Sequence, residues 1–168
     1  MPRSINLAAS SPHDIRQIRA AFDDPEYWRA RLAFVEGGSP TLDTFETDCA
    51  GITTMQMTMR FGGDQLPGPL QRLRLGSLHV VQHERWFAID GTTVDGEITI
   101  HAPRTPLSGQ GSVSMQAVGS GTALTGTAEV DVNVPIIGGK IAAFVAGLLA
   151  DGIVDIVRVT DTWLDAHS

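Results

Sequence analysis

The period of the apolar residues changes once along this chain, and that change constrains the fold more than any other feature. Between Thr41 and Val134, apolar and polar residues alternate in segments separated by Gly, Pro and Asp-Gly signals. From Pro135 to about Leu164 the apolar residues recur at helical spacing. At 1.5 Å per residue this helix is roughly 40 Å long. The pattern predicts an α+β fold in which one long C-terminal helix covers a curved antiparallel sheet.

The clearest strand spans residues 54–61, whose alternation is typical of an antiparallel sheet with one buried and one wet face. Its buried face is predicted to carry four large side chains, Met55, Met57, Met59 and Phe61. Later strands add four more residues to that face, Ile98, Ile100, Val113 and Met115. Hairpin turns are predicted at Asp90-Gly91 and at residues 119–121. Residues 62–69 are expected to form a turn, and residues 70–75 one or two helical turns over the mouth of the sheet.

The N-terminal region predicts one strand and two short helices, which gives a sheet of about seven strands in all. Residues 3–9 alternate weakly and form the strand. Ser11-Pro12, with Asp14 reaching back, predicts the start of the first helix and makes Ser11 its N-cap. Asp24-Pro25 repeats this signal for a second helix, which Gly37-Gly38 ends.

Composition narrows the organisation and the partners. The length of 168 residues fits a single domain, residues 1–168. Basic residues number 12 and acidic residues 19, and the net charge of -7 gives no electrostatic basis for binding nucleic acid or an anionic membrane. No run of about 18 apolar residues occurs, so no integral membrane association is expected. Cys49 alone excludes an internal disulfide, and residues 1–14 lack a signal-peptide stretch, so we expect a cytoplasmic protein.

Three local stretches accompany this order of elements: Ser11-Pro12 followed by residues 24–28, residues 84–86 before Asp90-Gly91, and residues 134–141. With them the chain resembles the START-like helix-grip superfamily, also called SRPBCC, and within it an uncharacterised bacterial branch. The resemblance covers essentially the whole chain. It implies a cavity between the sheet and the long helix for lipids, sterols, polyketides or other apolar molecules. It carries over no catalytic residue, because the superfamily shares no catalytic motif.

The residues expected to line this cavity are the eight apolar strand residues above and three helix residues that face them, Ile141, Phe144 and Leu148. Methionine is flexible and polarizable and suits an adaptable binding surface, although it also serves as core filler. The predicted partner is therefore a small apolar ligand, with no cofactor. The opposite face of the helix, with Asp151, Asp155 and Arg158, is expected to be solvated.

Residues 79–89 form a predicted strand with two competing registers, because a shift of one residue exchanges its faces. If the odd positions point inward, His83 and Arg85 do so too and can orient a ligand's polar group or act as acid and base. If the even positions point inward, both lie in water, and this register is favoured. On a strand, His79 and His83 lie some 13 Å apart, too far for one ion, so no metal site is predicted.

Three functions follow from these patterns. The first is a carrier, sensor or sequestering protein for a small apolar or amphipathic molecule. The second is an enzyme resembling polyketide cyclases and dehydratases, in which His83 or Arg85 steers enolate chemistry in the same cavity. The third is a protein-interaction module that binds a partner or, as a homodimer, a second copy of itself. Polar groups inside a closed apolar cavity favour the enzyme, an all-apolar lining favours the carrier, and a filled core with an exposed apolar patch favours the interaction module.

Overall fold

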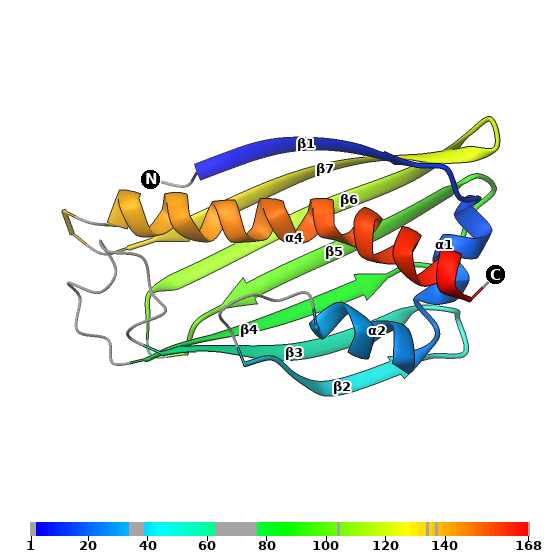
Figure 1. Ribbon diagram of the computed structural model, residues 1–168. Coiled ribbons are helices and arrows are strands. Elements are labelled where there is room, and N and C mark those ends of the chain that lie inside the picture. The colour runs from blue at the N-terminus through cyan, green and yellow to red at the C-terminus, as the bar shows by residue number, and fades with distance from the viewer. Residues whose placement is uncertain are drawn as a thin grey trace.

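Seven antiparallel strands form one curved sheet, and a long helix lies across one face of it (Figure 1). The computed structural model describes residues 3–33, 39–62, 77–103, 105–133, 135–136 and 138–167. The predicted α+β fold, with two short helices after the first strand and a long C-terminal helix, is confirmed. In chain order the elements are β1 (Arg3–Ser11), α1 (Ile15–Ala21), α2 (Pro25–Leu32), β2 (Thr41–Thr47), β3 (Thr53–Gly62), β4 (Ser77–Trp86), β5 (Thr93–His101), β6 (Leu107–Val118), β7 (Gly121–Val132) and α4 (Gly138–Ala166).

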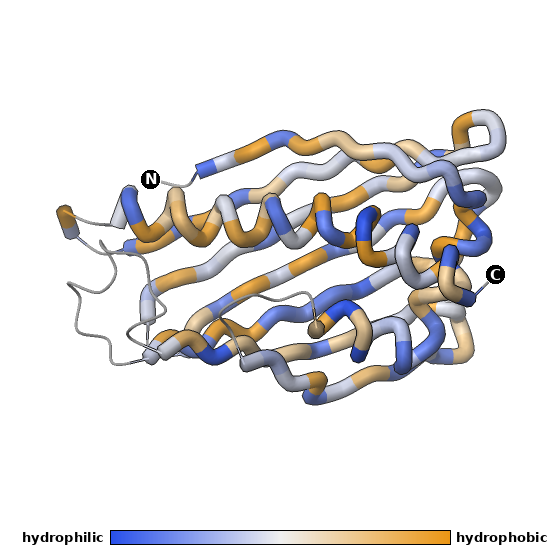
Figure 2. Tube along the Cα trace, in the orientation of Figure 1, coloured by the Kyte–Doolittle hydropathy of each residue, from blue (hydrophilic) through white to orange (hydrophobic). Residues whose placement is uncertain are grey.

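The strand order is β1-β7-β6-β5-β4-β3-β2, so β2 to β7 form a meander and β1 pairs with β7. β1 and β2 therefore lie at opposite edges of the sheet, and the chain between them carries α1 and α2 past one end (Figure 1). Hydrophobic and hydrophilic residues alternate along the strands (Figure 2), as a sheet with one buried face requires. Both predicted hairpin turns are present, with Gly91 and Gly119 at φ values of 61° and 59° that glycine adopts without steric cost.

The first helix starts later than predicted, because Asp14 and not Ser11 is its N-cap. The Asp14 carboxylate accepts a backbone N–H of the first turn, and the Gln17 side chain accepts the Asp14 N–H, which completes a capping box. The prediction for Ser11 is wrong: Ser11 is the last residue of β1, and its hydroxyl accepts the His13 N–H at 3.1 Å, ahead of the helix. The same hydroxyl donates a hydrogen bond of 2.5 Å to Asp161 on α4 and so ties the end of β1 to the long helix.

The second helix starts as predicted. The Asp24 side chain accepts the Glu26 N–H at 2.9 Å, and Pro25 occupies the first turn, where its missing N–H costs nothing. α2 ends at Leu32. The predicted stop at residues 37–38 and the turns predicted within residues 63–75 lie outside the described residues.

The long helix begins at Gly138, three residues after the predicted start at Pro135. Ile136 has a left-handed backbone, with φ at 71°, so the helix cannot run through it. From Gly138 the helix continues to Ala166, close to the predicted end. Within the described ranges, no helix combines the length and the apolar character that a bilayer span needs.

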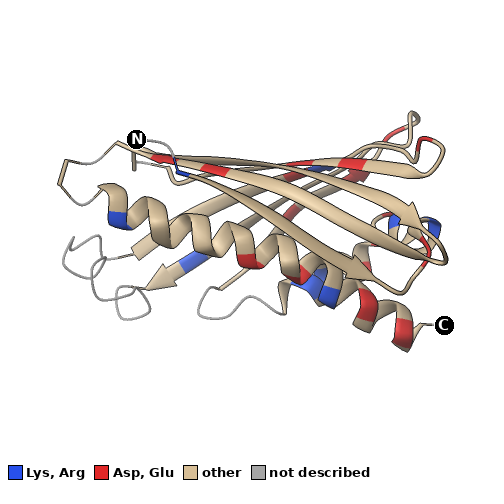
Figure 3. Cartoon of the chain, turned by 90° about the horizontal axis from the view of Figure 1, so that it is seen from above, with Lys and Arg blue, Asp and Glu red and all other residues tan. Residues whose placement is uncertain are grey.

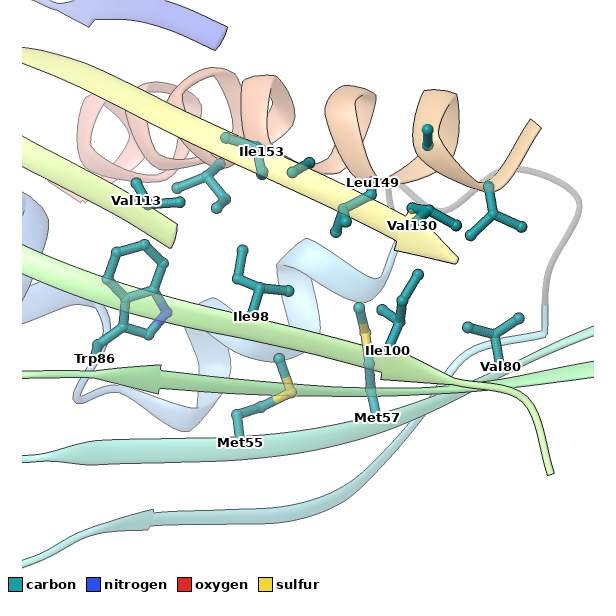
Figure 4. Close-up of a cluster of buried hydrophobic side chains, with 14 of the residues drawn as sticks. Met55, Met57, Val80, Trp86, Ile98, Ile100, Val113, Val130, Leu149 and Ile153 are labelled. Carbon is teal, nitrogen blue, oxygen red and sulfur yellow. The ribbon is translucent and has the colours of Figure 1, made fainter. Parts of the chain in front are cut away.

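α4 packs on one half of the sheet. It contacts β1 and β7 most, and β6 less. Gly111 and Gly126 lie beneath Ile153 of α4: a β-carbon built on either would be in ordinary van der Waals contact with the Ile153 methyl groups, at 3.5 or 3.6 Å. Figure 4 shows Ile153 and Leu149 pointing from α4 toward the sheet, with Met55 and Met57 rising from β3 on the other side. α4 therefore does not lie directly on β3, β4 and β5. The space over these three strands is bordered by side chains.

Candidate functional site

A cavity of about 570 Å³ lies over the half of the sheet that α4 leaves uncovered. This volume falls in the range of roughly 300–1,000 Å³ that is usual for small-molecule sites. Residues of α2, β2, β3, β4, β5 and α4 line it: Trp28, Arg31, Leu32, Leu42, Met55, Met57, Met59, Phe61, Val80, Gln82, Ile100, Val145, Leu148, Leu149, Asp151, Gly152, Val154, Asp155, Arg158 and Val159. The wall is largely apolar, and its polar groups fall at two places.

Six of the residues predicted for the cavity lie in its wall: Met55, Met57, Met59, Phe61, Ile100 and Leu148. Five others lie outside it. Ile98, Val113, Met115 and Ile141 are buried in the core, and Phe144 is half-buried against it. These five have the apolar environment that their pattern predicted, but the cavity occupies only part of the interface between sheet and helix.

The remaining two predicted residues, His83 and Arg85, are exposed on the outer face of the sheet. β4 has its even positions inward, and the buried residues are Leu78, Val80, Gln82, Glu84 and Trp86. Antiparallel pairing fixes this register, with His83 opposite Gln56 of β3 and Thr99 of β5. The assignment of His83 and Arg85 to the cavity is thereby corrected, and Gln82 and Glu84 take the inward positions.

Glu84 and Arg31 form a buried ion pair at the edge of the cavity. The Arg31 Nη1 and Nη2 atoms donate to Glu84 Oε1 and Oε2 at 2.9 and 2.8 Å. The Glu84 side chain has no exposed surface, and that of Arg31 is 9% exposed. Trp86 Nε1 donates to Oε1 at 3.0 Å, and Gln82 Nε2 to Oε2 at 2.8 Å. Four donors therefore surround one carboxylate, the arrangement expected of its ionised form.

The Arg31 guanidinium is held on its other sides by aromatic groups of its own helix. Its central carbon lies 4.8 Å from the ring centroid of Trp28, a cation–π contact. Burial opposes the charge, but the Glu84 carboxylate, together with Tyr27, keeps the pKa of Arg31 above its usual value. Burial also raises the pKa of Tyr27 to about 12, and its hydroxyl shares a hydrogen bond of 2.7 Å with Thr160 of α4. Tyr27 is thus a neutral group at neutral pH and not a base.

Gln82 presents one polar atom toward the cavity. A carboxylate only accepts hydrogen bonds, so the bond to Glu84 fixes the orientation of the Gln82 amide, with its NH₂ toward Glu84. The Gln82 Oε1 atom accepts no hydrogen bond from any residue that the structure describes. Gln82 and Arg31 both line the cavity and both donate to Glu84 Oε2 at 2.8 Å, so they are neighbours.

The second polar place is the rim, which α4 forms. Asp151 and Arg158 are exposed and Asp155 is half-buried, so the predicted solvated face is exposed as expected but also borders the cavity. Arg158 Nη2 pairs with Asp155 Oδ1 at 2.5 Å. Asp151 makes no ion pair within the described part of the chain. Acidic side chains gather in the C-terminal half of α4 (Figure 3), and the rim carries net negative charge.

The histidines and the cysteine do not assemble a metal site. Among the residues that the structure describes, no group of three His, Cys, Asp or Glu side chains is placed to hold a metal ion. His83 stacks on His101 with ring centroids 6.2 Å apart on the outer face of the sheet. Cys49 is exposed.

Sequence reasoning did not identify Arg31, Gln82 and Glu84 as members of the site. Glu84 could have been found from the register of β4 in which the even positions point inward, because this register places an acidic residue between two buried positions. A carboxylate there requires a buried cationic partner. Arg31 is 53 positions away in sequence, and nothing local distinguishes it from Arg29, which lies two residues earlier and is exposed.

The fold and the site together define a helix-grip protein with a mainly apolar cavity between the sheet and its helices. The chain belongs to the family described as "Protein of unknown function (DUF2505)", which matches residues 6–164. It is similar to the uncharacterized protein Rv0481c of Mycobacterium tuberculosis, with 25% identity over 173 residues that cover 98% of both chains.

Solved structures share the fold at low sequence identity. TTHA0849 of Thermus thermophilus has a TM-score of 0.61 and 14% identity over 99% of both chains. Ara h 8.0201 has a TM-score of 0.59 and 12% identity, also over 99% of both chains. The di-domain ARO/CYC protein StfQ, from the steffimycin biosynthetic pathway, has a TM-score of 0.61 and 11% identity over 99% of this chain and 52% of its own. At these identities the likeness concerns the fold.

Proposed function

We propose that the protein binds a small apolar or amphipathic molecule in the cavity between the sheet, α2 and α4, as a carrier or sensor. The observation that carries this proposal is a cavity of about 570 Å³ with walls of methionine and aliphatic side chains. Burying apolar ligand surface against such walls is favourable by about 25 cal/mol per Å². An interaction module would instead need a filled core, and a cavity of this size in the core argues against that alternative.

The cyclase-like alternative has less support, although two polar side chains, Arg31 and Gln82, lie in the wall. The Gln82 amide is not an acid or a base, and Arg31 does not lose its proton. The alternative relied on His83 or Arg85 as the catalytic group, and both are exposed on the outer face of the sheet. The inward ion pair does not replace them, because all four hydrogen bonds to Glu84 come from protein groups. A carboxylate held in this way is poorly suited to take a proton from a ligand. The carrier or sensor role needs no such group.

Titration with N-phenyl-1-naphthylamine, a neutral dye that brightens in apolar surroundings, tests the proposal. We expect saturable binding at one site per chain. Leu148→Trp fills the cavity from α4 and should weaken binding at least tenfold, because Leu148 is half-buried in the wall. Thr162→Trp is the matched control, since Thr162 is exposed on the same helix and outside the wall. Met57→Asp, which places a carboxylate in the apolar wall, should also weaken binding.

Two outcomes would contradict the proposal. The first is the absence of saturable binding by the folded wild-type protein. The second is binding that Leu148→Trp and Met57→Asp leave unchanged, which would place the dye elsewhere. Circular dichroism of each variant establishes that it is folded before its affinity is compared.

A further inference from the structure

We infer that the ligand carries an uncharged polar group that both donates and accepts hydrogen bonds, as an alcohol or phenol does, and that this group binds between Arg31 and Gln82. This inference rests on the proposed function and specifies the chemistry of the ligand. It follows from two features of the cavity, the hydrogen-bonding atoms of its inner wall and the charge of its rim.

The inner wall offers one donor group and one acceptor beside each other. A guanidinium has five N–H groups; Glu84 takes two of those of Arg31, and the Tyr27 hydroxyl also interacts with this guanidinium, which leaves N–H groups for a ligand. The fixed amide of Gln82 leaves its Oε1 atom as an acceptor without a donor from the described chain. A hydroxyl can accept from Arg31 and donate to Gln82 at the same time. A carboxylate can only accept, so it would leave Gln82 Oε1 without a donor and would face that oxygen's negative dipole.

The charges of the site also disfavour an anion. The positive charge of Arg31 is already balanced by Glu84, at hydrogen-bond distances of 2.9 and 2.8 Å. At the rim, Arg158 is balanced by Asp155, and Asp151 adds a negative charge. A bound carboxylate would therefore be an uncompensated charge in an apolar cavity, which is costly. The net charge of -7 on the whole chain also disfavours the binding of an anion.

Glu84 is a positioning residue in this arrangement. It has no exposed surface and does not line the cavity. Its two oxygen atoms orient the guanidinium of Arg31 and the amide of Gln82, so each presents a defined edge to the ligand. Polar groups that are fixed in this way discriminate more strongly between ligands than mobile ones, because a mismatched ligand leaves them unpaired.

Displacement of N-phenyl-1-naphthylamine by three ligands with the same twelve-carbon chain tests the inference at pH 8. The ligands are 1-dodecanol, which donates and accepts, 1-methoxydodecane, which only accepts, and dodecanoate, which is an anion. We expect the order alcohol, ether, carboxylate, with at least tenfold between the first and the last. The dye itself provides a further comparison. 1-Anilinonaphthalene-8-sulfonate differs from N-phenyl-1-naphthylamine only by a sulfonate group, and it should bind at least tenfold more weakly.

Gln82→Leu removes the acceptor and should bring the alcohol to the affinity of the ether while leaving the ether unchanged. Gln56→Leu is the matched control, because Gln56 lies on the neighbouring strand with its side chain on the outer face. If the wild-type protein binds dodecanoate as tightly as dodecanol, the inference is overturned although the cavity still binds ligands. If Gln82→Leu keeps the preference for the alcohol, the assignment to Gln82 is overturned. If the wild-type protein does not bind the dye at all, that result counts against the proposed function.

Discussion

Arg31 and Glu84 join α2 to β4 by two parallel hydrogen bonds of 2.9 and 2.8 Å, within a mainly apolar core. This pair holds α2 over the end of the sheet where the cavity lies, and Trp28 and Leu32 of the same helix form part of the cavity wall. The position of this wall thus depends on the buried ion pair, together with the hydrogen bonds that join Tyr27 to Thr160 and Trp28 to the Phe22 carbonyl oxygen.

Replacing one residue of this ion pair should lower the stability of the protein more than replacing both. Glu84→Leu leaves the Arg31 guanidinium buried without a counter-charge, and we expect a loss of about 3–5 kcal/mol in the free energy of unfolding. The double variant Arg31→Leu/Glu84→Leu removes both charges and should be more stable than Glu84→Leu. Urea denaturation at pH 7 measures both. A double variant less stable than the single one would contradict this account of the pair.

Trp86 connects this ion pair to the aromatic core, and Gly96 makes room for it. Trp86 lies opposite Gly96 on β5, and a β-carbon on Gly96 would be only 2.4 Å from two atoms of the indole ring. The ring is fully buried and lies 4.7 Å from Phe22 between centroids, so it has nowhere to move. Gly96→Ala should therefore cost about 1–3 kcal/mol through overpacking.

Tryptophan fluorescence and urea denaturation measure the effect of Gly96→Ala on the indole and on stability. The matched control is Gly139→Ala, since a β-carbon on Gly139 meets no atom within 4 Å. The control should be neutral or slightly stabilising in the first turn of α4. Equal effects of the two variants would show that the indole is not confined as described.

Most of the fold could be predicted because its signals are local. The alternation of residues 54–61 fixes the inward face of β3, and Asp24-Pro25 fixes the start of α2. The first helix was placed too early because Ser11 and Asp14 both resemble an N-cap. In the structure Ser11 belongs to β1, which pairs with β7, and its hydroxyl binds Asp161, a residue 150 positions away. Long-range contacts of this kind leave no trace in a local pattern.

The apolar part of the cavity wall could be predicted from periodicity, whereas its polar part could not. The methionines of β3 lie on an unbroken alternating face, so their direction follows from the pattern. On β4, Gln82 and Glu84 interrupt the apolar face, and both registers then contain charged residues. The extent of the cavity depends on where α4 sits over the sheet, against β1, β7 and β6, and these contacts join residues that are distant in sequence. That position separates Leu148, in the wall, from Phe144, outside it.

Arg19 is a second buried arginine, and it should be needed for stability alone. It donates to the carbonyl oxygens of Phe87 and Gly51 at 2.9 and 2.6 Å and to the Asp23 carboxylate at 2.9 Å. Arg19→Met leaves these acceptors unpaired, and we expect a loss of about 3 kcal/mol in thermal or urea unfolding. Arg16→Met on the exposed side of the same helix should change stability by no more than about 0.5 kcal/mol. A similar loss in both variants would contradict the role of Arg19.

Asp23 should make stability depend on pH in the acid range. Burial alone would raise the pKa of Asp23, but hydrogen bonds from Thr53, Arg19 and Thr47 lower it below its ordinary value of 3.8. The unfolded chain therefore binds a proton at a pH where the folded chain does not, so stability rises with pH through this window. The contribution is complete above pH 3.8 and is lost as the pH falls through the lower pKa of the folded state.

The measurement is the difference in free energy of unfolding between the wild-type protein and Asp23→Asn, from urea denaturation at pH 7 down to pH 2. This difference should be constant from neutral pH to about pH 5 and should shrink below about pH 4, because asparagine cannot be protonated there. Thr53→Val removes the hydroxyl that donates to Asp23 at 2.6 Å and should reduce the pH dependence while leaving the carboxylate in place. A difference that grows on acidification would mean that the folded state holds the proton more tightly than the unfolded chain, the reverse of what the Thr53 and Arg19 bonds require.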